Sequence, residues 1–229
     1  MSKAIFFALR RMIIMEKKKK IILQPVILLA VTVLFSILAT VVDRQAIGPE
    51  DTVVGFASLN GSFHDVFGYN AVFDTISDIM MYLSFLVVLY FAVAGLQRLV
   101  KKKSIEGVGK TILGLGILYV LVAILYVAFN HIPINYRPVI QPGETELETS
   151  FPSSHTLVIC TVMGSAIIAW QRLFTNKTAA KVSKICAIAV IVIGVVARLL
   201  AGVHWVTDII AGILFSATLI SFYAAWSVD

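Results

Sequence analysis

The feature of this sequence that most restricts its fold is a series of six long apolar stretches separated by short polar segments. A helix needs about 20 mostly apolar residues to cross the hydrocarbon core of a bilayer. The predicted spans are residues 21–42, 79–97, 111–129, 156–170, 185–203 and 209–226. Because a helix satisfies its own backbone hydrogen bonds in lipid, the sequence predicts an all-α, polytopic integral membrane protein with six transmembrane helices. A content of 59% hydrophobic residues excludes an ordinary soluble domain.

Basic residues are distributed unevenly between the two ends of these spans. If the N-terminus is cytoplasmic, 16 of the 19 lysines and arginines face the cytoplasm, and only Arg44, Arg137 and Arg198 face outward. Because lysine and arginine are retained in cytoplasmic loops, we expect both termini to be cytoplasmic. The net charge of +6 then reflects topology and contact with anionic inner-leaflet lipid, and it requires no nucleic-acid partner.

The chain is expected to form one membrane domain, residues 21–229, after a basic cytoplasmic segment, residues 1–20. This segment is too short and too charged to span, and we interpret it as an amphipathic surface segment. Two outer loops, residues 43–78 and 130–155, are long enough to hold functional residues. Apolar residues at helical spacing after Asp51 predict a short interfacial helix, which would act as a lid over a lipid entrance or as a structural cap.

Polar and ionisable side chains collect at the outer ends of the predicted spans, where their cost makes them candidates for function. They form three clusters: "NYRP" at 135–138, "FPSSH" at 151–155, and Arg198 with His204 and Asp208. Each residue alone has an ordinary explanation, such as snorkelling for Arg198 or helix capping for Asp208. The occurrence of all three clusters on one side of the membrane favours a functional site.

These residue types suit phosphate chemistry. His204 and Asp208 are four residues apart, so on a helical turn they would share a face. The carboxylate would then hold one imidazole nitrogen protonated and leave the other as a nucleophile or base. Arg137 and Arg198 present planar forks of donors suited to phosphate oxygens. The "FPSSH" stretch favours a helix start whose amides attract the same anion, with His155 as a second titratable group.

In the order and spacing of these motifs the chain resembles the phosphatidic acid phosphatase type 2 superfamily, also called the lipid phosphate phosphatase and vanadium haloperoxidase superfamily. The family pattern is Lys-x6-Arg-Pro, then Pro-Ser-Gly-His, then Ser-Arg-x5-His-x3-Asp. The matching residues are Arg137 and Pro138, then Pro152, Ser153 and His155, then Arg198, His204 and Asp208. Three positions depart from the pattern, with Asn130 in place of the lysine, Ser154 in place of the glycine and Ala197 in place of the serine.

The resemblance implies a role for each of these residues. By it, His204 attacks phosphorus to give a phosphohistidine, Asp208 orients His204, and His155 protonates the leaving oxygen. The expected phosphate-binding residues are Arg137, Arg198, Ser153, Ser154 and Asn130. No metal or other cofactor is expected, because the arginines and the helix amides would supply the positive charge.

The expected function is hydrolysis of a membrane-lipid phosphate monoester or pyrophosphate at the outer face of the cell membrane. Family analogy and sidedness rank undecaprenyl pyrophosphate first, followed by phosphatidylglycerol phosphate and phosphatidic acid. A fourth span of about 15 residues, or about 22 Å, would recess the site below the headgroups, as suits a lipid that enters sideways.

Three alternatives remain open. A lipid phosphotransferase would use the same phosphohistidine but pass the phosphoryl group to an acceptor other than water. A vanadate-dependent haloperoxidase shares the motifs but fits poorly with so many spans. A non-enzymatic transporter would place polar residues inside several spans, whereas here they gather at the outer ends.

Overall fold

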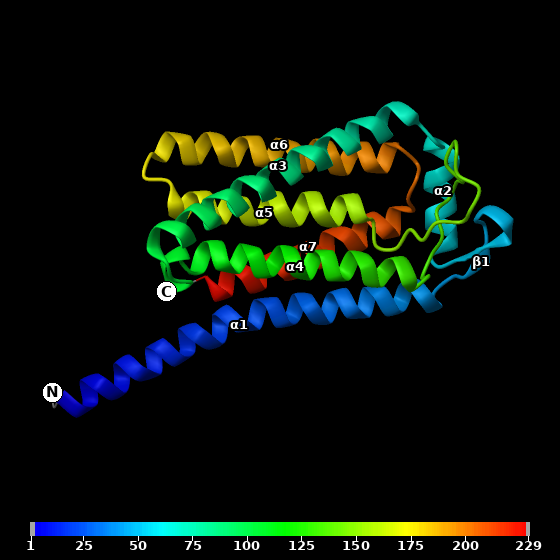
Figure 1. The fold of residues 1–229 in the computed structure, drawn as a ribbon. Helices are drawn as coiled ribbons and strands as arrows, with labels where there is room; N and C mark the ends of the chain where they lie inside the picture. The colour runs from blue at the N-terminus through cyan, green and yellow to red at the C-terminus, as the bar shows by residue number, and fades with distance from the viewer. Residues whose placement is uncertain (1–2, 228–229) are drawn as a thin grey trace.

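The computed structural model describes the backbone of residues 3–227 and the side chains of residues 21–227. In that part of the chain, six helices are long and apolar enough to cross a membrane, as predicted. They are α1 (Lys3–Val41), α3 (Ala71–Lys102), α4 (Lys110–His131), α5 (Ser154–Leu173), α6 (Lys177–Leu200) and α7 (Val206–Trp226). α1 begins and α7 ends at one end of the bundle, and most of the irregular chain gathers at the other end (Figure 1).

The backbone is helical from Lys3, so the basic N-terminal segment continues directly into the first span. The side chains of this segment lie outside the described residues, and its predicted position on the membrane surface therefore stays a prediction. At the same end of the bundle, the 3-10 helix η2 (Glu106–Val108) connects α3 to α4.

The first outer loop contains the short helix predicted after Asp51, α2 (Ala57–Phe67). It follows a small antiparallel pair, β1 (Gln45–Ala46) and β2 (Val53–Val54), which flanks the 3-10 helix η1 (Pro49–Asp51). α2 lies across the end of the bundle that is opposite the start of α1 and the end of α7 (Figure 1). Its fully buried Asn60 donates to Thr207 Oγ1 at 2.9 Å and accepts from Thr207 N at 3.2 Å. This attachment to α7 favours the interpretation of α2 as a structural cap over its interpretation as a lid.

The second span begins earlier than predicted. The Asn70 side chain caps α3 by accepting from the amides of Val72 and Phe73, so the helix starts at Ala71 and the first outer loop ends at Asn70. The prediction of a loop to residue 78 was wrong because the two turns of α3 that carry Asp74 and Asp78 are also helical. Both side chains instead find partners inside the bundle, which offset the cost of placing a carboxylate at the membrane edge.

The fourth span is longer than predicted. α5 has 20 residues, which corresponds to about 30 Å and matches the hydrocarbon core. The prediction of a short fourth helix that recesses the site was therefore wrong, because polar residues at both ends of α5 are also helical. The second outer loop is correspondingly shorter and covers residues 132–153.

The turn between α6 and α7 also differs from the prediction, because α6 ends at Leu200 and not at Val203. Gly202 has φ +66°, and a Cβ there would lie 1.7 Å from the carbonyl oxygen of Gly68. This close approach requires glycine. His204 consequently lies in an irregular turn rather than on a helix.

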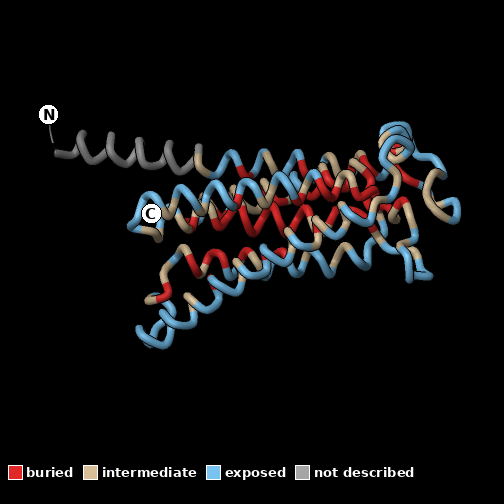
Figure 2. The backbone as a smooth tube through the Cα atoms, turned by 90° about the horizontal axis from the view of Figure 1, so that it is seen from above, coloured by how far each residue is buried: buried red, intermediate tan, exposed pale blue. Residues whose placement is uncertain are grey.

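α5 is the central helix and packs against α3, α4, α6 and α7. Eleven of its residues are buried, and buried backbone runs along the middle of the bundle (Figure 2). Gly212 on α7 allows a close approach, since a Cβ there would be 2.9 Å from Thr156 Cβ. This contact brings the start of α7, with Asp208, against the start of α5.

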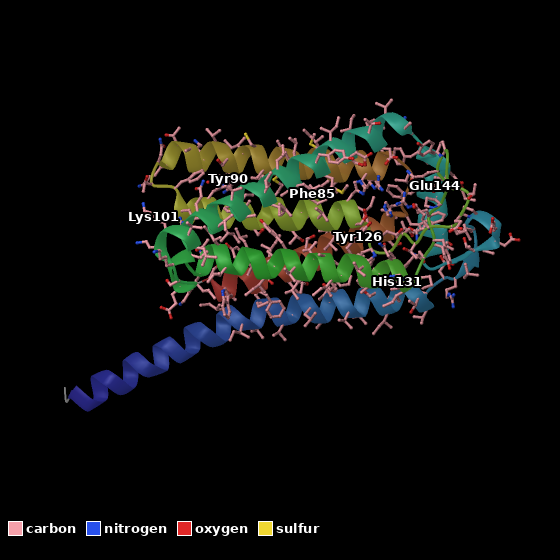
Figure 3. All side chains as sticks on the ribbon, viewed as in Figure 1. Phe85, Tyr90, Lys101, Tyr126, His131 and Glu144 are labelled. Carbon is pink, nitrogen blue, oxygen red and sulfur yellow. The ribbon has the colours of Figure 1, made fainter. Side chains whose placement is uncertain are left out.

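The outward faces of the spans are apolar, as lipid contact requires. Phe85 and Tyr90 lie along α3, whereas Glu144 lies in the second outer loop and Lys101 at the opposite end of the bundle (Figure 3). Phe85 and Tyr90 are both 47% exposed. Polar residues therefore concentrate at the ends of the bundle, where the site is found.

Candidate active site

The second outer loop folds back on itself above the bundle. Residues 135–137 pair with residues 148–150 through two backbone hydrogen bonds of 2.9 Å. The Trp205 indole Nε1 donates to the carbonyl oxygen of Tyr136 at 2.7 Å. The loop is thus fixed to the α6–α7 turn, and Arg137 is brought towards the residues of the third motif.

His204 is buried and its ring is fixed by an arginine. Its Nε2 lies 3.1 Å from Nη2 of Arg198. A guanidinium can only donate, so Nε2 accepts this bond and carries the lone pair, which leaves the proton on Nδ1. Burial, followed by the charges of Arg198, Arg137 and His155, holds the pKa of His204 well below its usual value. At neutral pH the imidazole is therefore uncharged, with the lone pair that a nucleophile needs on Nε2.

Asp208 is fully buried beside His204. Its Oδ1 accepts from Asn135 Nδ2 at 3.0 Å and its Oδ2 accepts from the amide of Trp205 at 3.1 Å. The distance from Oδ2 to His204 Nδ1 is 3.8 Å, within range of an ion pair but longer than a hydrogen bond. His204 and Asp208 are close together, as predicted, although their proximity arises from the α6–α7 turn and not from a shared helix face. Asp208 also acts as a helix cap, so the structural and the functional interpretations of this residue are compatible.

Arg198 is 1% exposed and reaches the site from the last turn of α6. Its Nη1 forms an ion pair with Asp74 and lies 3.3 Å from Ser77 Oγ, both on α3. Its Nη2 contacts His204. The guanidinium of Arg198 therefore contacts both the predicted nucleophile, His204, and the carboxylate of Asp74. To bind this guanidinium, a phosphate would have to displace Asp74.

Arg137 is the second guanidinium of the site. Its Nε lies 2.9 Å from Glu148 Oε2, and its Nη1 donates to the Gln141 amide oxygen. Gln141 Nε2 donates in turn to Asp74 Oδ2 at 2.9 Å. Through Gln141 and Asp74, the structure links Arg137 to Arg198, although these arginines are far apart in sequence and come from different elements.

His155 lies in the first turn of α5, and its side chain is 13% exposed. Its Nε2 is 2.8 Å from Asp78 Oδ1 on α3. Ser153 caps the same helix, with its Oγ accepting from Thr156 N at 3.4 Å. The Ser153 amide donates to the carbonyl oxygen of Asp208 at 3.0 Å. The amides of Ser153 and Thr156 are therefore already bonded and are not available to an anion.

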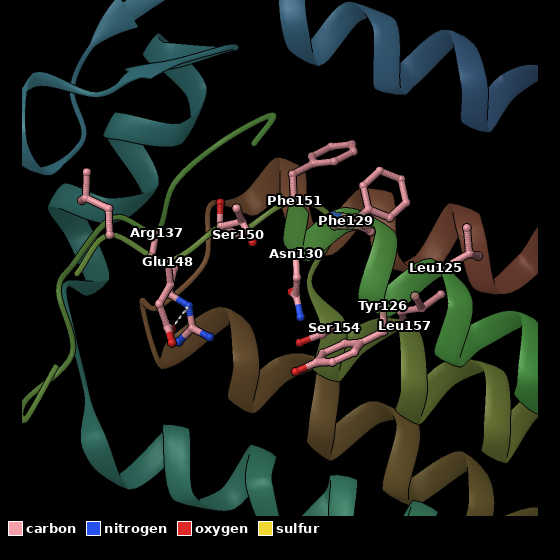
Figure 4. Close-up of a pocket in the computed structure, with 13 residues that line it drawn as sticks. Leu125, Tyr126, Phe129, Asn130, Arg137, Glu148, Ser150, Phe151, Ser154 and Leu157 are labelled. Atoms are coloured by element: carbon pink, nitrogen blue, oxygen red, sulfur yellow. Dashed lines mark ion pairs between the residues drawn. The ribbon is translucent and has the colours of Figure 1, made fainter. Parts of the chain in front are cut away.

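A cavity of about 270 Å³ opens between α4, α5 and the second outer loop. Asn130, Arg137 and Ser154, three of the predicted phosphate-binding residues, line it together with apolar side chains of α4 and α5. In Figure 4, Asn130 and Ser154 point towards one another, and Arg137 approaches from the loop in its ion pair with Glu148. This cavity has a polar and an apolar wall, whereas His204 and Arg198 lie outside its lining.

Several residues of the site were not found from the sequence, namely Asp74, Ser77, Asp78, Gln141 and Glu148, whereas Asn135 belongs to the "NYRP" cluster. Asp74 and Asp78 had a usable signal, because two carboxylates four residues apart at the outer edge of a span share a helix face. Among the described residues, no group of three or more His, Cys, Asp or Glu side chains is arranged to hold a metal ion.

A family model described as the PAP2 superfamily matches residues 112–229, more than half of the chain. Comparison of the sequence with curated proteins finds no match. The fold is similar to the crystal structure of the first transmembrane PAP2 type phosphatidylglycerolphosphate phosphatase from Bacillus subtilis, with a TM-score of 0.58 and 20% identity over 88% of this chain and 94% of that chain. The predicted resemblance is confirmed, since all three motifs from Arg137 to Asp208 fall within the matched residues. This multi-pass membrane protein therefore belongs to the PAP2 superfamily.

Proposed function

We propose that this protein is a lipid phosphatase that hydrolyses a phosphate monoester of a membrane lipid at the outer face of the cell membrane. The observation that carries this proposal is the convergence of five side chains from three separate parts of the sequence. His204 and Asp208, His155, and the guanidiniums of Arg137 and Arg198 gather at one end of the bundle. A nucleophile, its carboxylate, a second imidazole and two cations are the groups that metal-free phosphoryl transfer needs.

The proposed reaction has two steps. The Nε2 lone pair of His204 forms a bond to phosphorus while the bond to the lipid oxygen breaks, and His155 donates a proton to that oxygen. Asp208 stabilises the positive charge that develops on the His204 ring, and the arginines bind the phosphoryl oxygens. Water then attacks the phosphohistidine, His155 takes a proton from the water, and phosphate leaves.

The charges of the site support a lipid phosphate monoester over a lipid pyrophosphate as the substrate. Asp74 and Glu148 are paired with the two arginines, and Asp78 contacts His155. Asn130 brings no charge where the family pattern has lysine. The additional negative charge of a pyrophosphate would therefore meet carboxylates rather than further cations. On this ground we place phosphatidic acid and phosphatidylglycerol phosphate ahead of undecaprenyl pyrophosphate, which family analogy and sidedness rank first.

The test is phosphate release by the purified protein from these three lipids, with and without excess EDTA. We expect release from both monoesters, a lower kcat/KM for the pyrophosphate, and no effect of EDTA, since the proposal needs no metal. Loss of activity in EDTA that Mg²⁺ restores would contradict the metal-free mechanism. Appearance of a phosphorylated acceptor instead of free phosphate would identify a phosphotransferase.

Sidedness can be tested by labelling introduced cysteines in intact cells. Glu146 in the second outer loop and Lys177 at the start of α6 are both exposed and lie at opposite ends of the bundle. In a background with Cys160 and Cys186 replaced, Glu146→Cys is expected to react with a membrane-impermeant maleimide and Lys177→Cys is not, because lysine and arginine are retained in the cytoplasm. The reverse labelling would place the site in the cytoplasm and exclude outer-leaflet lipids as substrates.

Asn130→Lys tests the most conspicuous departure from the family pattern. Because Asn130 and Arg137 line the same cavity, a lysine there would place a cation within reach of the phosphoryl group. We expect a lower KM or a higher kcat for phosphatidic acid, since charge-assisted contacts to phosphate are about twice as strong as neutral ones. His131→Lys, at the neighbouring exposed position, is the control. A change of less than about twofold in both kcat and KM, as for ordinary exposed charges, would show that Asn130 is not part of the site.

A further inference from the structure

α3 brings a carboxylate to the imidazole that we propose as the general acid. Asp78 Oδ1 lies 2.8 Å from Nε2 of His155. Asp78 is one helical turn after Asp74, which is paired with Arg198. Both acidic side chains of this face of α3 therefore contact residues of the family motifs, although α3 lies outside residues 112–229, which the family model matches.

The partner of Nε2 determines which nitrogen of His155 is available for chemistry. A carboxylate accepts hydrogen bonds, so Nε2 donates its proton to Asp78. The other nitrogen, Nδ1, is buried and has no hydrogen-bond partner among the side chains and backbone of the described residues. At His204 the roles are reversed, since Nε2 carries the lone pair and Nδ1 faces Asp208. The nitrogen that faces a carboxylate therefore differs between the two imidazoles, since it is Nε2 in His155 and Nδ1 in His204.

We propose that Asp78 is a positioning residue for His155: it holds the doubly protonated ring through Nε2–H and leaves Nδ1–H to protonate the leaving oxygen. This inference rests on the proposed function. In the first step the Nδ1 proton moves to the lipid oxygen as the P–O bond breaks and His204 Nε2 bonds to phosphorus. In the second step Nδ1 takes a proton from the attacking water, the P–N bond breaks, and both rings return to their starting state. The proton on Nε2 stays with Asp78 throughout.

The charged groups around His155 come from four parts of the chain. They are Asp78 on α3, Arg198 on α6, Arg137 in the outer loop and His204 in the α6–α7 turn. Asp78 is the carboxylate in hydrogen-bond contact, so its negative charge acts against burial and the guanidiniums of Arg198 and Arg137, which disfavour the protonated ring. Removal of the Asp78 charge is therefore expected to shift the alkaline limb of the pH profile of kcat to lower pH.

Asp78→Asn removes the charge and retains an oxygen that can accept from Nε2. The side chain of Asp78 is 44% exposed, so the substitution leaves no cavity. We expect kcat for phosphatidic acid to fall about 10- to 100-fold, in keeping with partial loss of general acid catalysis. With p-nitrophenyl phosphate, whose leaving group needs little protonation, we expect a loss of less than about threefold. Asp65→Asn, an exposed change of the same kind on α2, is the control and should match the wild type on both substrates.

A second comparison separates positioning from a structural role. In a His155→Ala background, Asp78→Asn should cause no further loss on phosphatidic acid, because the two residues act as one unit. The inference would be overturned by any of three results for Asp78→Asn. These are equal losses on the two substrates, additive losses in the double variant, or an unchanged pH profile of kcat. If the wild type releases no phosphate from any lipid, the proposed function itself fails. That result differs from an active wild type whose activity does not depend on Asp78, which would overturn the role of Asp78 alone.

Discussion

His204→Ala is expected to lower phosphate release by about four orders of magnitude, because the substitution removes the atom that forms the bond to phosphorus. His204 Nε2 carries the lone pair, since its partner Arg198 can only donate. The measurement is single-turnover hydrolysis of phosphatidic acid by purified protein. Quenching of the wild type in alkaline detergent should also trap a phosphohistidine, stable in alkali and lost on acid treatment, that is absent in the variant.

The matched control is His131→Ala, which changes an exposed histidine at the end of α4. We expect its activity to equal that of the wild type. Thermal unfolding in detergent should show that both variants remain folded. Turnover in folded His204→Ala within about tenfold of the wild type would refute the phosphohistidine mechanism.

Asp208→Asn is expected to lower kcat by about three orders of magnitude with little change in KM. The ring of His204 becomes positively charged as it bonds to phosphorus, and the fully buried carboxylate is 3.8 Å from Nδ1. A neutral amide cannot stabilise this charge, so the loss falls on the chemical step and not on binding. The comparison of kcat and KM for phosphatidic acid measures the effect.

Asparagine can still accept from the amide of Trp205, so the start of α7 should remain capped in this variant. Asp51→Asn is the control, because Asp51 is exposed and asparagine tolerates its left-handed backbone conformation, with φ of 58°. A rise in KM without a fall in kcat would show that Asp208 acts in binding. An unchanged kcat would leave Asp208 with a capping role alone.

The resemblance to the PAP2 superfamily could be read from local patterns because each motif is short. The spacing from Arg198 to His204 and Asp208 lies within one segment of sequence, and the family match confirms the resemblance. The number of spans could also be predicted, since hydropathy accumulates along a continuous stretch. The ends of the spans were less certain, because polar residues in a first or last turn are indistinguishable from loop residues without their partners.

The sequence by itself determined the class of fold, the family and the set of residues proposed for the chemistry, because these depend on composition and on spacing within single segments. Only the tertiary structure decided which of those residues meet and what holds them. The predicted second span begins at residue 79, so Asp74 and Asp78 fall within the predicted loop. They are helical because Arg198 and His155 lie opposite them across two helix interfaces. The nitrogen of His204 that carries the lone pair was likewise decided by a contact between side chains, since the orientation of a histidine ring depends on its partners and not on its neighbours in sequence.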